Sequence, residues 1–227
     1  MNYKRPQNIQ AITAAARAGL PDAPIFVLDQ AERPEDRWRD DDAAAGVWVH
    51  RSKVNAGAGA RVPLASRLPF DFYVAIDDDI FLQPAQIARL AAIVRSAPGR
   101  AHGVWGERLE LNDGAVASNG FRTRVDIGVS MLNRVYAFSR AQAAGALALA
   151  QKLGFAAWAD VGPTDDILLS CGGLNPPRCH DLGEFGECPT SNTPGVAVWK
   201  SQGFTNRRVD VVTRLIDAKA IAVYRPA

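Results

Sequence analysis

Three consecutive aspartates, Asp77, Asp78 and Asp79, follow an apolar run and could bind a divalent cation. The preceding residues 72–76 (FYVAI) have the length and the β-branched and aromatic composition of a buried strand. Neighbouring carboxylates repel one another, and desolvating them is costly unless positive charge lies between them. A hard divalent cation supplies that charge and often bridges to phosphate oxygens. The alternative is a solvated acidic turn, such as the one we expect at 40–42.

The spacing of these carboxylates indicates which of them could share a cation. If extended geometry continues beyond the strand, Asp77 and Asp79 lie on one face and Asp78 on the other. A second acidic pair, Asp165 and Asp166 in VGPTDDILLS, precedes an apolar helical run, where it could also serve as an N-cap. Two carboxylate sites in one domain suggest that one holds metal and nucleotide while the other faces a reacting sugar.

Composition excludes several functional classes. The chain has 227 residues, a net charge of +2, 48% hydrophobic and 22% charged residues, which is ordinary for a globular protein. The near-balanced charge gives no indication of a nucleic-acid partner. No apolar stretch reaches the roughly 18 residues of a transmembrane segment, and no signal peptide follows Met1. We therefore expect a cytoplasmic protein.

The three cysteines, Cys171, Cys179 and Cys188, lie close together, with His180 among them. Their spacing matches no common zinc motif, because no CxxC pair is present. We interpret them as buried or idle thiols of a reducing compartment. A bridge between Cys179 and Cys188 is the alternative if the protein is exported.

Helical and strand-like segments alternate along the first half of the chain. The pattern predicts helices at 7–19, 60–68, 84–95, 141–153 and 204–219, and strands at 25–28, 47–49, 72–76, 102–111 and 125–132. This βαβ rhythm predicts an α/β fold with a mostly parallel mixed sheet and helices on both faces. Ligands bind at the carboxyl ends of strands in such sheets, which is where the aspartates fall. We expect one domain over 1–227.

Several segments in the right order resemble the GT-A fold glycosyltransferases. They are NYKRPQNI at the start, Asn55 with Arg61, the strand-borne aspartates, TDDILLS, and VWKSQGFTNRRVDVVTRL. The last two are most similar to the exostosin-type retaining transferases, which use UDP-sugars and Mn²⁺. In that family a Trp stands nine residues before an Arg and sixteen before a Leu, as Trp199, Arg208 and Leu215 do here. The likeness implies a Rossmann-like GT-A domain with a nucleotide-binding half at 1–100 and an acceptor and catalytic half at 101–227.

The resemblance assigns the cationic and polar residues to the nucleotide. Tyr3 and Arg5 match the loop that grips the nucleotide, and Asn55 and Arg61 match contacts to uridine or the donor sugar. Arg208 would neutralise charge on the leaving diphosphate.

The resemblance also divides the work among the aspartates. Asp77 and Asp78 would contact the ribose or donor sugar, and Asp79 would hold Mn²⁺ or Mg²⁺ against the diphosphate, with Asp77 as a further ligand. Asp166, with Asp165, would lie near the anomeric carbon or the acceptor hydroxyl. A carboxylate there can stabilise positive charge or act as a base. These residues leave open whether the anomeric configuration is retained or inverted.

Two departures from the family pattern are visible. The family places a hydrophobic strand before NYKRP, so the resemblance implies a sheet that lacks its first strand in these residues. The family's histidine, four residues before the arginine, is Phe204 here. A contact to the metal or diphosphate would therefore be lost.

The sequence therefore predicts a metal-dependent glycosyltransferase of the hexosyl- or N-acetylhexosaminyltransferase type. It would move a sugar from a nucleotide-sugar, a UDP-sugar by resemblance, to a carbohydrate or glycoconjugate acceptor. One alternative is a nucleotidyltransferase, which also places paired aspartates and Mg²⁺ at a sheet edge but usually carries a Gly-rich basic loop. The other is a catalytically impaired nucleotide- or sugar-binding protein. The donor sugar, the acceptor and the oligomeric state stay open.

Overall fold

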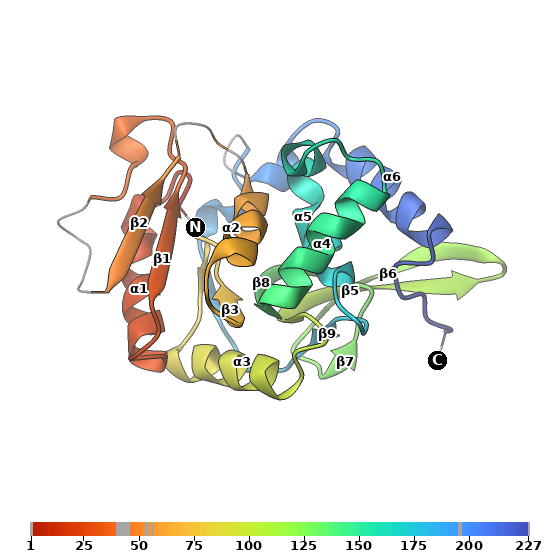
Figure 1. Ribbon diagram of the computed structural model, residues 1–227, viewed down its shortest axis with the longest axis horizontal. Coiled ribbons are helices and arrows are strands. Elements are labelled where there is room, and N and C mark those ends of the chain that lie inside the picture. Colours follow the sequence, from red (N-terminus) through yellow and green to blue (C-terminus); the bar gives the residue numbers. More distant parts are fainter. Residues whose placement is uncertain (1, 40–45, 53–54, 56, 195–196, 227) are drawn as a thin grey trace.

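The computed structural model describes residues 2–39, 46–52, 55, 57–194 and 197–226 (Figure 1). The acidic turn expected at 40–42 lies outside these residues. The α-helices are α1 (Pro6–Gly19), α2 (Arg61–Arg67), α3 (Pro84–Ser96), α4 (Arg140–Lys152), α5 (Asp165–Cys171) and α6 (Phe204–Asp217). Short 3₁₀ helices are η1 (Pro34–Asp36), η3 (Ala58–Ala60), η4 (Trp158–Thr164), η5 (Pro189–Asn192) and η6 (Val198–Lys200).

Within the described residues, the strands form three separate hydrogen-bonded sheets. They are β1 (Ile25–Asp29), β2 (Val47–Arg51), β3 (Phe72–Ala75), β4 (Ile80–Phe81), β5 (His102–Asn112), β6 (Ala115–Thr123), β7 (Ile127–Gly128), β8 (Met131–Ser139), β9 (Arg178–Cys179) and β10 (Gly186–Glu187). β1 pairs with β2, β10 pairs with β4, and a six-stranded sheet has the order β3-β8-β5-β9-β7, with β6 attached to β5. In Figure 1, β1 and β2 lie at one end of the molecule and the β5–β6 hairpin projects from the other.

The class predicted from the sequence, a mixed α/β fold with helices on both faces of the sheet, is confirmed. Parallel pairing joins β1 to β2 and β5 to β9. The other described pairs of the six-stranded sheet are antiparallel, because β8 runs between β3 and β5 in the opposite direction and β5–β6 is a hairpin. The expected predominance of parallel pairs therefore holds for β1 and β2 but not for the six-stranded sheet.

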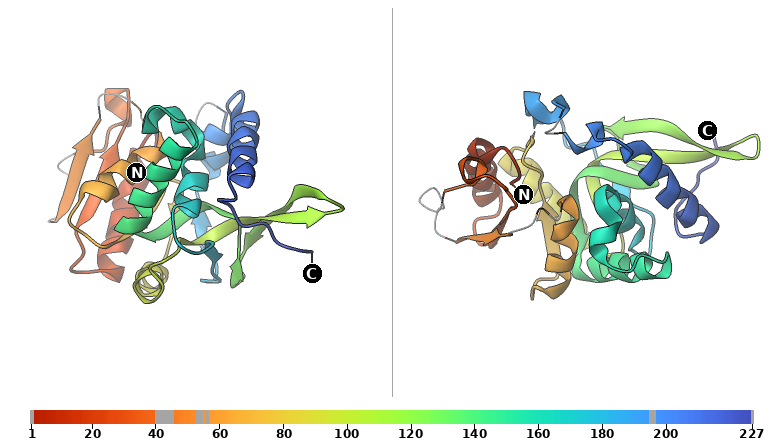
Figure 2. Two further views of the ribbon diagram at one scale, coloured as in Figure 1. Left: turned by 45° about the vertical axis from the view of Figure 1, so that its right-hand side comes forward. Right: turned by 90° about the horizontal axis from the view of Figure 1, so that it is seen from above.

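Helices cover both faces of this sheet, as the turned views show (Figure 2). Side chains alternate along β8, so that Tyr136 and Phe138 enter one buried cluster with α2 and α4, while Ala137 enters another with α3. All three residues are at most 1% exposed. Burial on both faces explains why β8 is apolar at successive positions, as is typical of a central strand.

Most predicted elements are confirmed within a few residues, because their boundaries carry clear local signals. Pro6 and Pro84 begin α1 and α3 at the position where a missing N–H costs nothing. α3 also carries a capping box between Gln83 and Gln86. The strand expected at 125–132 is wrong: that segment contains the two-residue β7, a turn and only the start of β8.

Candidate functional site

The three aspartates lie in the turn between β3 and β4, not on an extended strand. β3 ends at Ala75, and the Ile80 amide donates back to the Asp77 carbonyl at 3.3 Å. The alternation expected for Asp77, Asp78 and Asp79 therefore does not apply, and each side chain takes its direction from the turn. The carboxyl end of β3 is nevertheless where the sequence places them.

Asp78 is a buried anchor for the N-terminal segment. Its carboxylate accepts a bond from the Arg5 guanidinium at 2.6 Å and one from the Tyr3 backbone N–H at 2.9 Å. The Asn8 amide donates to the Asp78 carbonyl at 2.8 Å. Both carboxylate oxygens are engaged, so Asp78 holds the NYKRPQNI segment against the turn. Tyr3 takes part through its backbone.

Arg5 also connects the turn to the long segment after α5. Its guanidinium donates to the Thr190 hydroxyl at 2.8 Å and to the Thr190 carbonyl at 3.1 Å. The Cys188 amide donates to the Asp79 carbonyl at 2.8 Å. Part of the long segment at 172–198 is therefore bonded to Arg5 and to the backbone of Asp79. Cys188 is a free thiol, as are Cys171 and Cys179.

Arg61 joins the two acidic sites that the sequence identifies separately. Its Nη2 lies 2.9 Å from Asp77 Oδ1, and its Nε lies 3.9 Å from Asp165 Oδ2. The guanidinium also lies over the Tyr136 ring, 5.1 Å from its centre. The Arg61 side chain is only 8% exposed, so its charge is neutralised mainly by these two carboxylates.

Asp166 is paired with Arg208 at the start of α5. Arg208 Nη1 donates to both carboxylate oxygens, at 2.7 and 2.8 Å. Phe204, which occupies the position of the family's histidine, contacts the same guanidinium through its ring, at 5.4 Å from its centre. In this structure Arg208 therefore neutralises Asp166. Phe204 lies one turn before Arg208 on α6.

The carboxylates outnumber the cations in this cluster. We call Asp77, Asp78, Asp79, Asp165, Asp166, Arg5, Arg61 and Arg208 the acidic cluster; its five carboxylates and three guanidinium groups leave a formal charge of −2. Burial raises the pKa of Asp79, and the neighbouring Asp77 raises it further. Uncompensated negative charge of this kind is what a divalent cation would neutralise.

Asp77 and Asp79 are the members of the acidic cluster best suited to hold a cation. Their side chains are 21% and 16% exposed, more than those of the other three aspartates. Asp77 Oδ1 is buried and has only Arg61 Nη2, at 2.9 Å, as a described ion-pair partner, and Asp79 has Arg5 no nearer than 3.7 Å. The described residues form no group of three or more His, Cys, Asp or Glu ligands for a metal. Phosphate oxygens and water would therefore have to complete the coordination.

One predicted site residue lies apart from the acidic cluster. Asn55 is exposed, and its side chain accepts a bond from the Gly57 N–H at 2.9 Å. It shapes the loop before η3. The same loop brings Gly59 against Asp165, and a methyl group at Gly59 would lie 3.0 Å from Asp165 Cβ.

Sequence reasoning missed several residues that complete the acidic cluster. Asn8 lies within the NYKRPQNI motif, so its polar side chain one turn after Arg5 was a usable signal. In the sequence, Tyr136 is indistinguishable from an ordinary aromatic residue of the core. Thr190 lies in a segment without helical or strand periodicity. Nothing in the sequence connects Thr190 with Arg5, because 185 positions separate them.

Asp165 predicts a distinctive pH dependence of stability. Burial raises its pKa from 3.8 to about 7; Arg61 opposes the shift and Asp166 adds to it. Between these pH values the folded chain holds a proton that the unfolded chain releases, so this residue makes the free energy of unfolding fall as the pH rises. Urea unfolding should be measured at about pH 5 and pH 8. Between these values, the free energy of unfolding of wild type should fall by roughly 2–4 kcal/mol more than that of Asp165→Asn.

The difference between the two chains isolates this effect from the histidines. Burial lowers the pKa of His102 to about 4 and also lowers the pKa of His180, which makes stability rise with pH below 6.5 in both chains. That contribution cancels when the profiles are subtracted. Parallel profiles for wild type and Asp165→Asn would contradict the shifted pKa of Asp165.

No helix in the described part of the chain is both long and apolar enough to cross a membrane.

Neither a known protein-family model nor a curated protein matches the sequence. Among solved structures, the chain is similar to a CMP:2-keto-3-deoxy-manno-octonic acid synthetase complexed with CTP, with 13% identity and a TM-score of 0.40, over 96% of this chain and 79% of that chain. A likeness this distant says nothing about what this chain binds or does, and the functional conclusion rests on the acidic cluster.

Proposed function

We propose that the protein is a divalent-metal-dependent transferase that acts on a nucleotide-sugar. The observation that carries this proposal is the acidic cluster, in which carboxylates from two parts of the chain share Arg61 and keep a formal charge of −2. One divalent cation balances that charge. The cluster lies at the carboxyl end of β3, where α/β folds bind ligands.

Asp79 and Asp77 would hold the cation, Mn²⁺ or Mg²⁺, against a diphosphate. Bound there, the cation would neutralise negative charge that grows on the leaving diphosphate. Arg5 is held in place by Thr190 and Asp78, so it can face the same phosphates without reorganising. Asp78 acts through Arg5 and the Tyr3 backbone, by fixing the nucleotide side of the site.

Asp165 and Asp166 would face the reacting sugar. In glycosyl transfer, the bond from the anomeric carbon to the phosphate oxygen breaks, and its electron pair leaves with the nucleoside diphosphate. The acceptor hydroxyl oxygen forms the new bond to that carbon and gives up its proton. Asp165, with a pKa of about 7, is suited to receive that proton near neutral pH, and Asp166 can stabilise positive charge at the anomeric carbon.

Nucleotidyl transfer is the second candidate, because it uses the same carboxylate-held cation and differs in the bond that breaks. It would couple a sugar to a nucleoside triphosphate and release pyrophosphate. Glycosyl transfer is favoured because each arginine of the acidic cluster is engaged by a carboxylate, which leaves a negative site better suited to a diphosphate with its cation than to a triphosphate.

Product analysis distinguishes the candidates. The protein is incubated with Mn²⁺ and a panel of nucleotide-sugars, and separately with nucleoside triphosphates and free sugars, and the products are identified by mass spectrometry. We expect metal-dependent release of a nucleoside diphosphate from one nucleotide-sugar. Release of pyrophosphate instead would identify nucleotidyl transfer. Nucleotide binding with no turnover in either arm would indicate a binding protein and contradict both candidates.

A further inference from the structure

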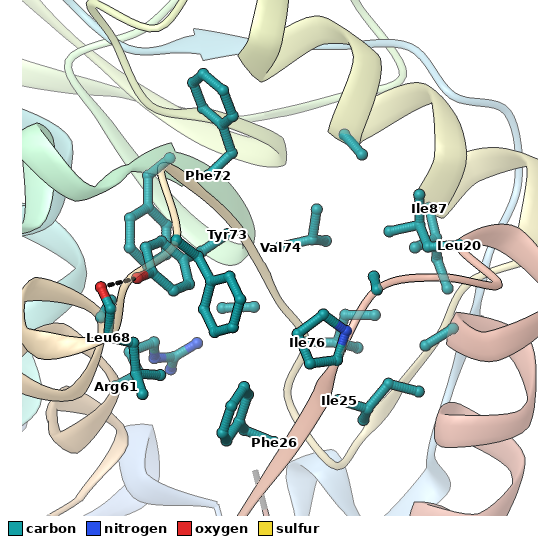
Figure 3. A pocket seen from close by; sticks show the side chains of 18 of the residues that line it. Leu20, Ile25, Phe26, Arg61, Leu68, Phe72, Tyr73, Val74, Ile76 and Ile87 are labelled. Carbon is teal, nitrogen blue, oxygen red and sulfur yellow. Dashed lines mark hydrogen bonds between the residues drawn. The ribbon is translucent and has the colours of Figure 1, made fainter. Parts of the chain in front are cut away.

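A large apolar groove separates β1 from β3 (Figure 3). Its volume is about 700 Å³, and β1 and β3 line its two sides. Figure 3 shows side chains from both strands, among them Phe26, Tyr73 and Val74, around the same open space. The groove reaches the acidic cluster through Arg61, but most of its lining is far more apolar than that site.

Both strands along this groove lack a strand partner on the side that faces it. In the described part of the chain, β1 pairs as a strand only with β2, and β3 pairs only with β8. The apolar sequence of β3 is typical of a strand that is covered on both sides, yet Phe72 is 36% exposed and its three successors are half-buried. Open backbone edges next to exposed apolar side chains are the features of a position where a strand is missing.

Helices cover this position from two directions. Ile9 and Ile12 of α1 and Ile87 and Val94 of α3 line the groove on one side, and Leu64 of α2 lines it on another. A strand placed between β1 and β3 would therefore be packed on both faces. Its residues would have to be apolar at successive positions, as in a buried parallel strand.

The backbone of Asn2 already begins the required ladder. Asn2 forms a parallel bridge with Asp29 at the end of β1. Its N–H donates to the Leu28 carbonyl at 2.8 Å, and its carbonyl accepts from the Gln30 N–H at 2.9 Å. A strand that continued this register backwards from Asn2 would pass Leu28 and then the rest of β1 towards Ile25. That path leads along the groove.

We propose that the groove is the seat of a parallel β-strand, which polypeptide joined directly before Met1 would form. About five or six apolar residues would match the length of β1. The strand would join β1 and β3 through backbone hydrogen bonds and close the groove. It would end at Asn2, next to Tyr3 and Arg5, and so stiffen the N-terminal side of the acidic cluster.

N-terminal extensions test this directly. Four chains are compared with residues 1–227: one carries the six residues encoded directly upstream of Met1, one carries six Val and Ile residues, and two are controls. The first control is a Gly/Ser extension of equal length. The second is the Val/Ile extension with two central prolines, which cannot donate to the ladder. Thermal unfolding and hydrogen exchange of β1 and β3 amides are measured for each.

We expect the upstream-encoded and the Val/Ile extensions to raise the Tm by about 5 °C or more, and to slow exchange in both β1 and β3. The Gly/Ser and proline extensions should leave both unchanged. The proposal is overturned if the upstream-encoded extension behaves like the Gly/Ser control, or if the Tm rises without protection of both strands. It is also overturned if residues 1–227 form a dimer in which β1 and β3 are already protected, since a second copy would then fill the groove.

Discussion

Asp79→Asn is expected to weaken metal-dependent binding of a nucleoside diphosphate by on the order of 100-fold, without loss of stability. Asp79 is one of the two most exposed carboxylates of the acidic cluster, so it is the natural cation ligand. Burial and Asp77 raise its pKa, which means that its ionised form destabilises the metal-free fold. The amide removes that charge. When the Asp79→Asn protein is titrated with UDP in the presence of Mn²⁺, the calorimetric binding signal should therefore be lost. The urea midpoint of the variant should be unchanged or higher than that of wild type.

Asp113→Asn is the matched control for this substitution. Asp113 lies in the exposed turn of the β5–β6 hairpin with a φ of 49°, a conformation that Asn adopts readily. It should leave both nucleotide affinity and stability unchanged. An Asp79→Asn protein that binds UDP and Mn²⁺ as wild type does would remove Asp79 from the metal site.

Arg61→Met is expected to destabilise the fold by about 3–5 kcal/mol. It removes the guanidinium that lies between Asp77 and Asp165, and so leaves Asp165 buried without its nearest described cation. Adding Asp165→Asn should recover most of the loss, because Asp77 is exposed enough to be hydrated. Urea unfolding of the two single variants and the double variant measures this coupling.

A surface ion pair provides the comparison. Arg140 and Asp71 lie 3.2 Å apart with side chains 47% and 74% exposed, so Arg140→Met should cost less than about 1 kcal/mol. If Arg61→Met costs no more than Arg140→Met, or if Asp165→Asn gives no recovery, Arg61 does not hold the two acidic sites together.

Local signals in the sequence were sufficient to predict most elements and the position of the aspartates just after β3. Proline and capping residues fix where α1 and α3 begin, and the apolar run of β3 ends at the aspartates. The two acidic pairs were identified separately, and Arg61 joins them in the fold. Their pairing could not be derived from spacing, since Asp77 and Asp165 come from segments 88 positions apart.

What the sequence could not supply depends on contacts between distant segments. The direction of β8 decides that the six-stranded sheet is largely antiparallel, and no local pattern encodes that direction. Arg5 meets Thr190, and Arg208 pairs with Asp166, only after the second half of the chain packs on the first. Asn55, which the motif assigns to uridine or the donor sugar, bonds Gly57 in the exposed loop before η3, and that assignment stays a prediction.

Direct measurement of Mn²⁺ binding tests the central claim, that the acidic cluster holds a divalent cation against a nucleotide diphosphate. Free Mn²⁺ is titrated with the protein and followed by electron paramagnetic resonance, with and without UDP. We expect about one Mn²⁺ bound per chain, with affinity increased by UDP and lost in Asp79→Asn. Mn²⁺ binding that is absent, or that is equally strong in Asp79→Asn and indifferent to UDP, would contradict the claim.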